Sequence, residues 1–172
     1  MDGTRSTGWL YRVEPGGEVT RVAGPCICVN GPAFAPSGET IYYVDSYGRA
    51  VYCAAVDSAG QMSRPRVFTT FGDSTWGYPD GLTCDASGCV WIAHWGGSRI
   101  SRFAPDGSLL DVIPLPVRQP TSCAFGGPDL KTLFVTSASM GLQDEHNGNG
   151  LAGALFAIDV GIAGIPTARF AG

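Results

Sequence analysis

Three side chains that carry oxygen donors, Asn30, Asp80 and Thr121, occupy the same place in three similar segments of the sequence. In each segment the polar residue is followed by a short apolar stretch, a tight turn and a second stretch rich in β-forming residues. An amide oxygen and a carboxylate that meet at one point form a site for a hard divalent cation. The alternative is that Asn30 and Asp80, each of which precedes a glycine, serve only to form turns.

The spacing of these segments predicts the fold. The polar positions lie at 30, 80 and 121, which gives intervals of 50 and 41 residues. A period of about 40–50 residues with several short strands per unit is typical of the blades of a β-propeller. We therefore predict an all-β fold in which residues 1–172 form a partial β-propeller of about three and a half blades.

The predicted units are a half blade over about 8–22 and blades over about 30–70, 80–114 and 120–170. The predicted strands are, in order, 9–13, 18–22, 32–35, 40–45, 50–55, 67–70, 81–84, 89–94, 99–103, 109–114, 122–125, 132–136, 154–159 and 167–170. Turn residues separate them, and no helical period of useful length is present. No propeller closes with this number of blades, so we expect either the C-terminal part of a longer chain or the meeting of two copies.

The innermost strand of a propeller blade lines the central channel. Asn30, Asp80 and Thr121 stand at the start of the predicted innermost strands, so we expect all three at one mouth of that channel. The loops at 45–48, 94–97 and 137–153 should open on the same mouth. Within these loops we interpret His94 as a structural histidine and the segment 144–146 as an exposed turn, with a ligand role as the alternative for each.

Composition excludes some classes of partner. The net charge of −4 gives no electrostatic reason to expect binding to nucleic acid or to an anionic membrane. No run approaches the roughly 18 apolar residues of a membrane-spanning helix. Residues 1–5 show no apolar segment of a secretory signal, and we expect a cytoplasmic protein.

Six cysteines lie mostly within apolar strand patterns. We expect them to be reduced, buried thiols, and the alternative is a disulfide between Cys84 and Cys89 across a hairpin turn. The pair Cys26 and Cys28 lacks the additional closely spaced cysteines or histidines of a structural zinc site. The glycine pairs at 96–97 and 126–127 are interpreted as turns, because no helix follows that would bind a phosphate.

Several ordered motifs resemble the senescence marker protein/gluconolactonase family, which includes regucalcin. They are NGPAF at 30–34, YPDGL at 78–82, WIAHWGG at 91–97 and PTSCAFGG at 120–127, and the segment 151–172 resembles the C-terminus of that family. The resemblance implies a six-bladed propeller with one divalent metal ion, Ca²⁺, Zn²⁺ or Mn²⁺, bound by Asn, Asp and Glu side chains.

Carried over to this sequence, the resemblance implies that Asn30 and Asp80 are metal ligands and that Asp80 is also the catalytic base. Thr121 is not a ligand in that pattern. The metal-binding Glu and the substrate-contacting Arg and Asn of the family belong to a region that this sequence does not cover.

The function implied by the resemblance is metal-dependent hydrolysis of sugar lactones such as gluconolactone, impaired in this chain by the missing ligand. The alternatives are a non-catalytic calcium-binding or interaction module of the same fold, and a hydrolase of other esters such as organophosphates. Self-association through exposed blade edges is the further expectation for partners.

Overall fold

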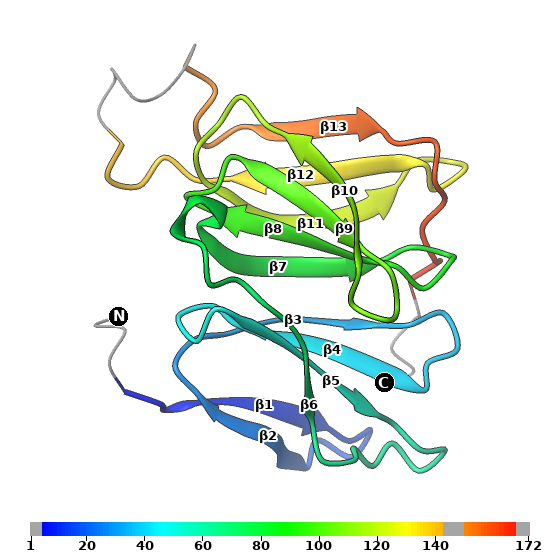
Figure 1. Ribbon diagram of the computed structural model, residues 1–172. Helices are drawn as coiled ribbons and strands as arrows, with labels where there is room; N and C mark the ends of the chain where they lie inside the picture. Colours follow the sequence, from blue (N-terminus) through cyan, green and yellow to red (C-terminus); the bar gives the residue numbers. More distant parts are fainter. Residues whose placement is uncertain (1–4, 143–149, 168–172) are drawn as a thin grey trace.

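The computed structural model describes residues 5–142 and 150–167, which form strands and one short 3₁₀ turn, η1 (Ser74–Trp76). The strands, shown in Figure 1, are β1 (Gly8–Val13), β2 (Val19–Cys26), β3 (Val29–Phe34), β4 (Thr40–Asp45), β5 (Ala50–Ala55), β6 (Arg66–Thr70), β7 (Tyr78–Cys84), β8 (Val90–Trp95), β9 (Arg99–Phe103), β10 (Leu109–Pro114), β11 (Pro120–Gly126), β12 (Thr132–Ser137) and β13 (Leu155–Asp159). Within these ranges no helix is long and apolar enough to cross a membrane.

The strands form four antiparallel sheets, each built by consecutive strands. Their orders are β1-β2, β3-β4-β5-β6, β7-β8-β9-β10 and β11-β12-β13. The sheets stack one on another in chain order, from β1-β2 at the bottom of Figure 1 to β11-β13 at the top. The first strand of each later sheet lies against the first strand of the next, β3 on β7 and β7 on β11. The all-β prediction is confirmed, and the arrangement is that of successive propeller blades.

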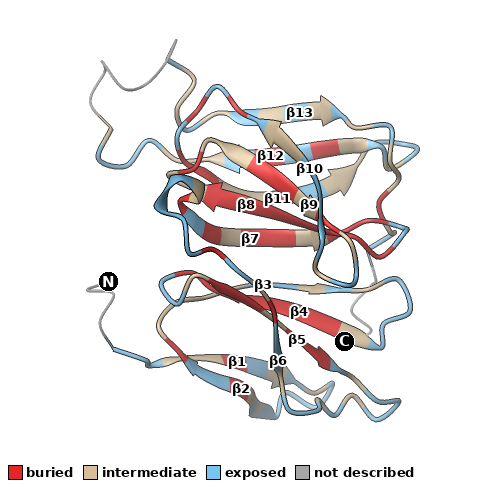
Figure 2. Ribbon diagram, viewed as in Figure 1, coloured by how far each residue is buried: buried red, intermediate tan, exposed pale blue. Residues whose placement is uncertain are grey.

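The hydrophobic core lies between the sheets. Strands β4 and β8, which read as nearly continuous apolar runs, bury both of their faces (Figure 2). Alternate side chains point to opposite faces of a strand, so Tyr42 packs toward β7–β10 while Tyr43 packs toward β1–β2. In the same way Ile92 faces the preceding sheet and Trp91 the following one. Each inner sheet therefore joins two cores.

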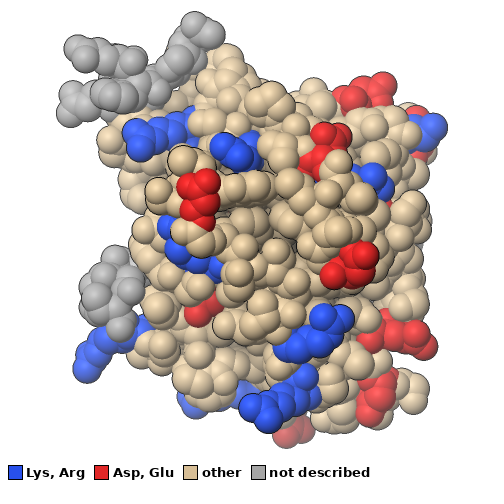
Figure 3. All heavy atoms as spheres, viewed as in Figure 1, with Lys and Arg blue, Asp and Glu red and all other residues tan. Residues whose placement is uncertain are grey.

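The surface carries mixed charge. Acidic and basic side chains are scattered over the face drawn in Figure 3, and most of that face is uncharged. The chain as a whole has 15 acidic and 11 basic residues.

The innermost strands differ from their predicted bounds. We predicted that they begin at 32, 81 and 122, but β3, β7 and β11 begin at Val29, Tyr78 and Pro120. The polar residues at 30, 80 and 121 thus lie inside strands, where the pairing register is irregular in each case. Such an irregularity lets glycine and proline remain in a strand and turns a side chain away from its normal direction. The interpretation of Asn30 and Asp80 as turn residues is therefore wrong.

The last predicted strand, at 167–170, falls outside the described residues except for Thr167, which is not in a strand. The segment 160–167 instead returns to the second four-stranded sheet. Ala86 donates its N–H to the carbonyl of Ala163 at 2.8 Å, and Asp85 forms a β-bridge with Gly164. This contact ties the third blade to the second at the end opposite the start of the innermost strands.

A close approach of backbones brings β7 against β11. A Cβ atom placed on Gly81 would lie 2.5 Å from the Cβ of Ser122 and 2.8 Å from its Cα. No side chain larger than hydrogen fits there without moving one of the two strands.

We predict that Gly81→Ala lowers the free energy of unfolding by about 1–3 kcal/mol, the usual effect of overpacking. Thermal unfolding would show it as a lower midpoint. The matched control is Gly72→Ala, because a Cβ there meets nothing within 4 Å and should leave the midpoint unchanged. Equal midpoints for the two variants would mean that β7 and β11 are not in close contact.

Candidate functional site

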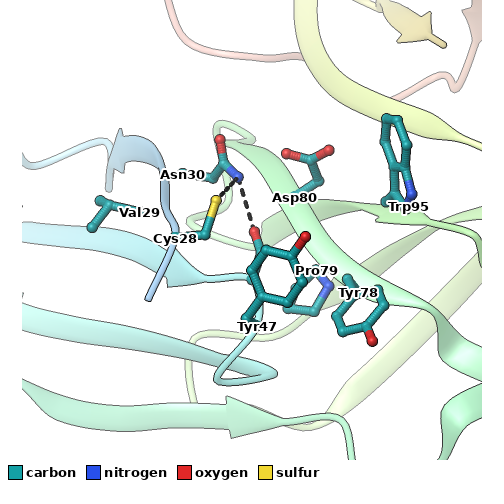
Figure 4. Close-up of a pocket in the computed structure, with 9 residues that line it drawn as sticks. Cys28, Val29, Asn30, Tyr47, Tyr78, Pro79, Asp80 and Trp95 are labelled. Carbon is teal, nitrogen blue, oxygen red and sulfur yellow. Dashed lines mark hydrogen bonds between the residues drawn. The ribbon is translucent and has the colours of Figure 1, made fainter. Parts of the chain in front are cut away.

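A cavity of about 370 Å³ opens where β3 and β7 begin (Figure 4). The lining residues come from the two innermost strands, from the segment before β3, from the loop after β4 and from the end of β8. They are Cys28, Val29, Asn30, Ser46, Tyr47, Tyr78, Pro79, Asp80 and Trp95. Two of the three predicted donors, Asn30 and Asp80, are thus brought to one cavity.

The amide of Asn30 is oriented by its nitrogen. Nδ2 donates to Oγ of Ser46 at 2.9 Å and to Sγ of Cys28 at 3.8 Å. Figure 4 shows the amide oxygen on the other side, in the space toward which the carboxylate of Asp80 also points. The hydrogen bonds therefore leave the oxygen, and not the nitrogen, available to a ligand in the cavity.

The carboxylate of Asp80 is partly buried, and no basic side chain among the described residues forms an ion pair with it. Burial raises its pKa from 3.8 to about 6, and the hydrogen bond from the N–H of Gly81 opposes this only in part. Within residues 5–142 and 150–167 the ion pairs are Arg12–Glu14 and Arg102–Asp85, so neither neutralises Asp80. Desolvation disfavours the charged form, and a cation in the cavity would restore it.

The wall around Asn30 is held by the buried carboxylate of Asp45. It accepts hydrogen bonds from the N–H groups of Ile27 (3.1 Å), Cys28 (3.0 Å) and Gly48 (3.2 Å). The N–H of Ser46 in turn donates to the carbonyl of Cys28 at 2.9 Å. The segment before β3 and the loop after β4 are thereby fixed to each other, which sets the position of both partners of the Asn30 amide.

Thr121 does not join this group. Its hydroxyl forms a hydrogen bond of 2.7 Å with the hydroxyl of Thr136 on the neighbouring strand β12, and the residue does not line the cavity. Thr121 stands near the start of β11, as expected, but its side chain is engaged across its own sheet and does not face this cavity.

His94 is fully buried near the end of β8 and does not line the cavity. Its Nε2 lies 2.6 Å from Oγ of Ser101, and its ring packs against Phe71 and Trp76 at centroid distances of 4.9 and 5.3 Å. Burial lowers its pKa to about 3, so the ring is neutral at physiological pH. Its interpretation as a structural histidine is confirmed. The segment 144–146, the other ligand alternative, lies outside the described residues.

Several lining residues were not predicted individually. Ser46, Tyr47 and Trp95 belong to loops that we did expect at this mouth. Cys28 was missed because all the cysteines were interpreted as buried thiols. It lies in a bend just before β3, and no pattern in the sequence distinguishes it from the other five cysteines.

All six cysteines are free thiols, so the alternative of a Cys84–Cys89 disulfide is wrong. Five of the six are buried, and Cys28 is partly exposed. In the described ranges no three His, Cys, Asp or Glu side chains are grouped closely enough to hold a metal ion. The donors that do face one cavity, Asn30 and Asp80, are of the oxygen type that hard divalent cations prefer.

Known proteins similar to this chain are lactonases and regucalcins. The family described as SMP-30/Gluconolactonase/LRE-like region matches residues 1–139. The sequence is 37% identical to 6-deoxy-6-sulfogluconolactonase of Pseudomonas putida, over 98% of this chain and 58% of that protein. It is 35% identical to L-arabinolactonase of Azospirillum brasilense, over 98% of this chain and 56% of that protein.

Solved structures with a similar fold include a regucalcin and a luciferin-regenerating enzyme. A crystal structure of the calcium-binding protein regucalcin from Agrobacterium tumefaciens matches with a TM-score of 0.86 at 31% identity, over 95% of this chain and 56% of that one. A luciferin-regenerating enzyme matches with a TM-score of 0.83 at 33% identity, over 94% and 54%. The chain thus spans little more than half the length of these relatives.

The raised pKa of Asp80 predicts a pH-dependent stability. The folded state holds the proton more tightly (pKa about 6 against 3.8), so the contribution of Asp80 to stability is fully present below pH 3.8 and is lost as the pH rises through 6. In metal-free buffer, Asp80→Asn should therefore raise the unfolding midpoint at pH 7.5 by several degrees and leave it nearly unchanged at pH 4.

The control for this experiment is Asp111→Asn, which removes an exposed carboxylate on β10. It should show no such difference between the two pH values. A midpoint for Asp80→Asn that follows the control at both pH values would mean that Asp80 is not desolvated.

Proposed function

The chain belongs to the SMP-30/gluconolactonase/LRE-like family, and from this we propose that it supplies part of a metal-dependent site for the hydrolysis of sugar lactones. The observation that carries the proposal is the shared cavity: Asn30 on β3 and Asp80 on β7 come from neighbouring innermost strands and line one opening. Relatives named as lactonases of sugar acids support the choice of substrate.

The residues present fit one divalent cation, with Ca²⁺, Zn²⁺ or Mn²⁺ as candidates. Asn30 would contribute its Oδ1, a neutral donor, and Asp80 would contribute its carboxylate. The hydrogen bond from Asn30 to Ser46 holds the amide in the orientation that this requires. The desolvated carboxylate of Asp80, which the N–H of Gly81 compensates only in part, attracts a cation into the cavity.

A bound cation would polarise the lactone carbonyl and favour deprotonation of the attacking water. Asp80 would orient that water and accept its proton while the water oxygen bonds to the carbonyl carbon. The ring C–O bond then breaks, and the departing ring oxygen takes up a proton to give the open hydroxy acid. Tyr47, Tyr78 and Trp95 give the cavity aromatic walls against which the C–H faces of a sugar derivative can pack.

A second candidate function is cation binding without turnover, and the small number of ligands that this sequence supplies favours it over efficient catalysis. Asn30 and Asp80 provide two oxygen donors, whereas Ca²⁺ takes six to eight oxygen ligands. The third protein ligand and the substrate contacts expected for the family belong to a region outside this sequence. We therefore propose weak or no hydrolysis by the 172-residue chain itself.

Isothermal titration calorimetry with Ca²⁺, Mn²⁺ and Zn²⁺ tests the site. We expect Asn30→Ala and Asp80→Ala each to weaken binding by at least about tenfold, since each removes a direct ligand. Thr121→Ala is the control and should leave affinity unchanged, because Thr121 does not line the cavity. Unchanged affinity in both ligand variants would refute the proposed site.

A pH-stat assay with gluconolactone and each metal tests the catalytic step separately. The 172-residue chain should give hydrolysis close to the uncatalysed rate. Robust turnover that depends on Asp80 would support the lactonase function and refute the argument that this chain lacks necessary ligands. Robust turnover that survives Asp80→Ala would refute the role of Asp80.

A further inference from the structure

A second cavity, of about 440 Å³, opens between the two-stranded sheet β1-β2 and the four-stranded sheet β3-β4-β5-β6 that follows it. These two sheets are neighbours at the bottom of Figure 1. The lining comes from β1 and β2, from β4 and β5, and from the segment before β6. This cavity shares no lining residue with the cavity between β3 and β7, and its volume is in the range of small-molecule binding sites.

The base of this cavity carries a hydroxyl group without a partner. Tyr43 lines the cavity although its side chain is only 3% exposed. No described residue forms a hydrogen bond with its hydroxyl, and that oxygen is not one of the fully enclosed atoms that lack a partner, so it opens on the cavity. Burial raises the pKa of Tyr43 to about 12, and the hydroxyl is therefore protonated at neutral pH. An unpaired donor on a buried side chain is uncommon, and a ligand in the cavity would satisfy it.

Two exposed arginines, Arg21 and Arg64, stand at the rim of the same cavity. Neither side chain forms an ion pair or a hydrogen bond with any described residue. The guanidinium of Arg21 lies over the ring of Trp9, 5.0 Å from its centroid, and Trp9 also lines the cavity. Packing on the ring face orients the guanidinium and leaves its N–H groups free for an anion.

The carboxylate of Asp45 is the only acidic group among the described residues that line this cavity. It accepts hydrogen bonds from the N–H groups of Ile27 (3.1 Å), Cys28 (3.0 Å) and Gly48 (3.2 Å). Its oxygens are therefore occupied by the backbone, and it forms no ion pair with either arginine. Two guanidinium groups against one satisfied carboxylate give the cavity an excess of positive charge.

We propose that this cavity binds a small heteroaromatic phosphate, a chemical class that includes the nucleoside monophosphates. Arg21 and Arg64 would bind the phosphate at the rim through charge-assisted hydrogen bonds. Trp9 and Tyr52 provide aromatic surfaces against which a heteroaromatic ring can stack. Tyr43 would donate its hydroxyl to a ring nitrogen or carbonyl, and its own ring is held by stacking on Tyr52 at 5.3 Å.

Titration calorimetry of AMP into the 172-residue chain, in metal-free buffer with a chelator, tests this proposal. We expect saturable binding, and adenosine and inorganic phosphate should each bind at least about tenfold more weakly, since each keeps only part of the contacts. Arg21→Ala and Arg64→Ala should each weaken AMP binding by at least about tenfold. Tyr43→Phe should weaken it several-fold and leave the unfolding midpoint unchanged, because the hydroxyl loses no partner within the protein.

The matched control is Arg66→Ala, which removes an exposed arginine of the same segment that does not line the cavity. It should keep the affinity for AMP, and circular dichroism verifies that all the variants are folded. Asp80→Ala should also keep this affinity, so that either this proposal or the proposed metal site can fail without the other. Absence of saturable AMP binding, AMP binding that survives both Arg21→Ala and Arg64→Ala, or inorganic phosphate that binds as tightly as AMP would overturn the proposal.

Discussion

The close approach of neighbouring innermost strands is the constraint on which the candidate site depends. Asn30 and Asp80 belong to different sheets, and they line one cavity only because β3 packs directly on β7. On the other side of β7, the backbone at Gly81 lies against Ser122 of β11 with no room for a side chain. The glycine that follows Asp80 is thus part of the site, although it offers no functional group.

Three carboxylates in this chain are partly or fully buried, and they differ in how their negative charge is compensated. Asp45 is satisfied by backbone N–H groups, and Asp85 by Arg102, the indole of Trp91 and two backbone N–H groups. Both hold loops in place. Asp80 has no such set of partners among the described residues, and burial raises its pKa to about 6. An incompletely compensated charge in a cavity is what distinguishes a candidate functional carboxylate from a structural one.

Much of the fold was predictable because the middle strands bury both faces and therefore read as unbroken apolar runs, as in β4 and β5, whose bounds were predicted correctly. The innermost strands were less predictable, because glycine and proline at 31–32 and 79–81 indicate turns and only the three-dimensional register reveals an irregular strand. Repetition pointed to Asn30 and Asp80. It misled for Thr121, whose hydroxyl bonds to Thr136, and it was silent on Cys28, because nothing in a single sequence tells which thiol escapes burial.

The location of the core between sheets has a consequence for how the molecule comes apart. No blade here has a hydrophobic core of its own. Tyr42 is buried against the following sheet, and Ile41 is buried against the preceding one. Stability should then behave like that of a linear array, in which each unit is held by its nearest neighbours and loss of a terminal unit uncovers the next. Fraying would start at β1-β2 and at β13, whose outward residues Val13 and Leu155 are already exposed, and would reach the cavity between β3 and β7 last.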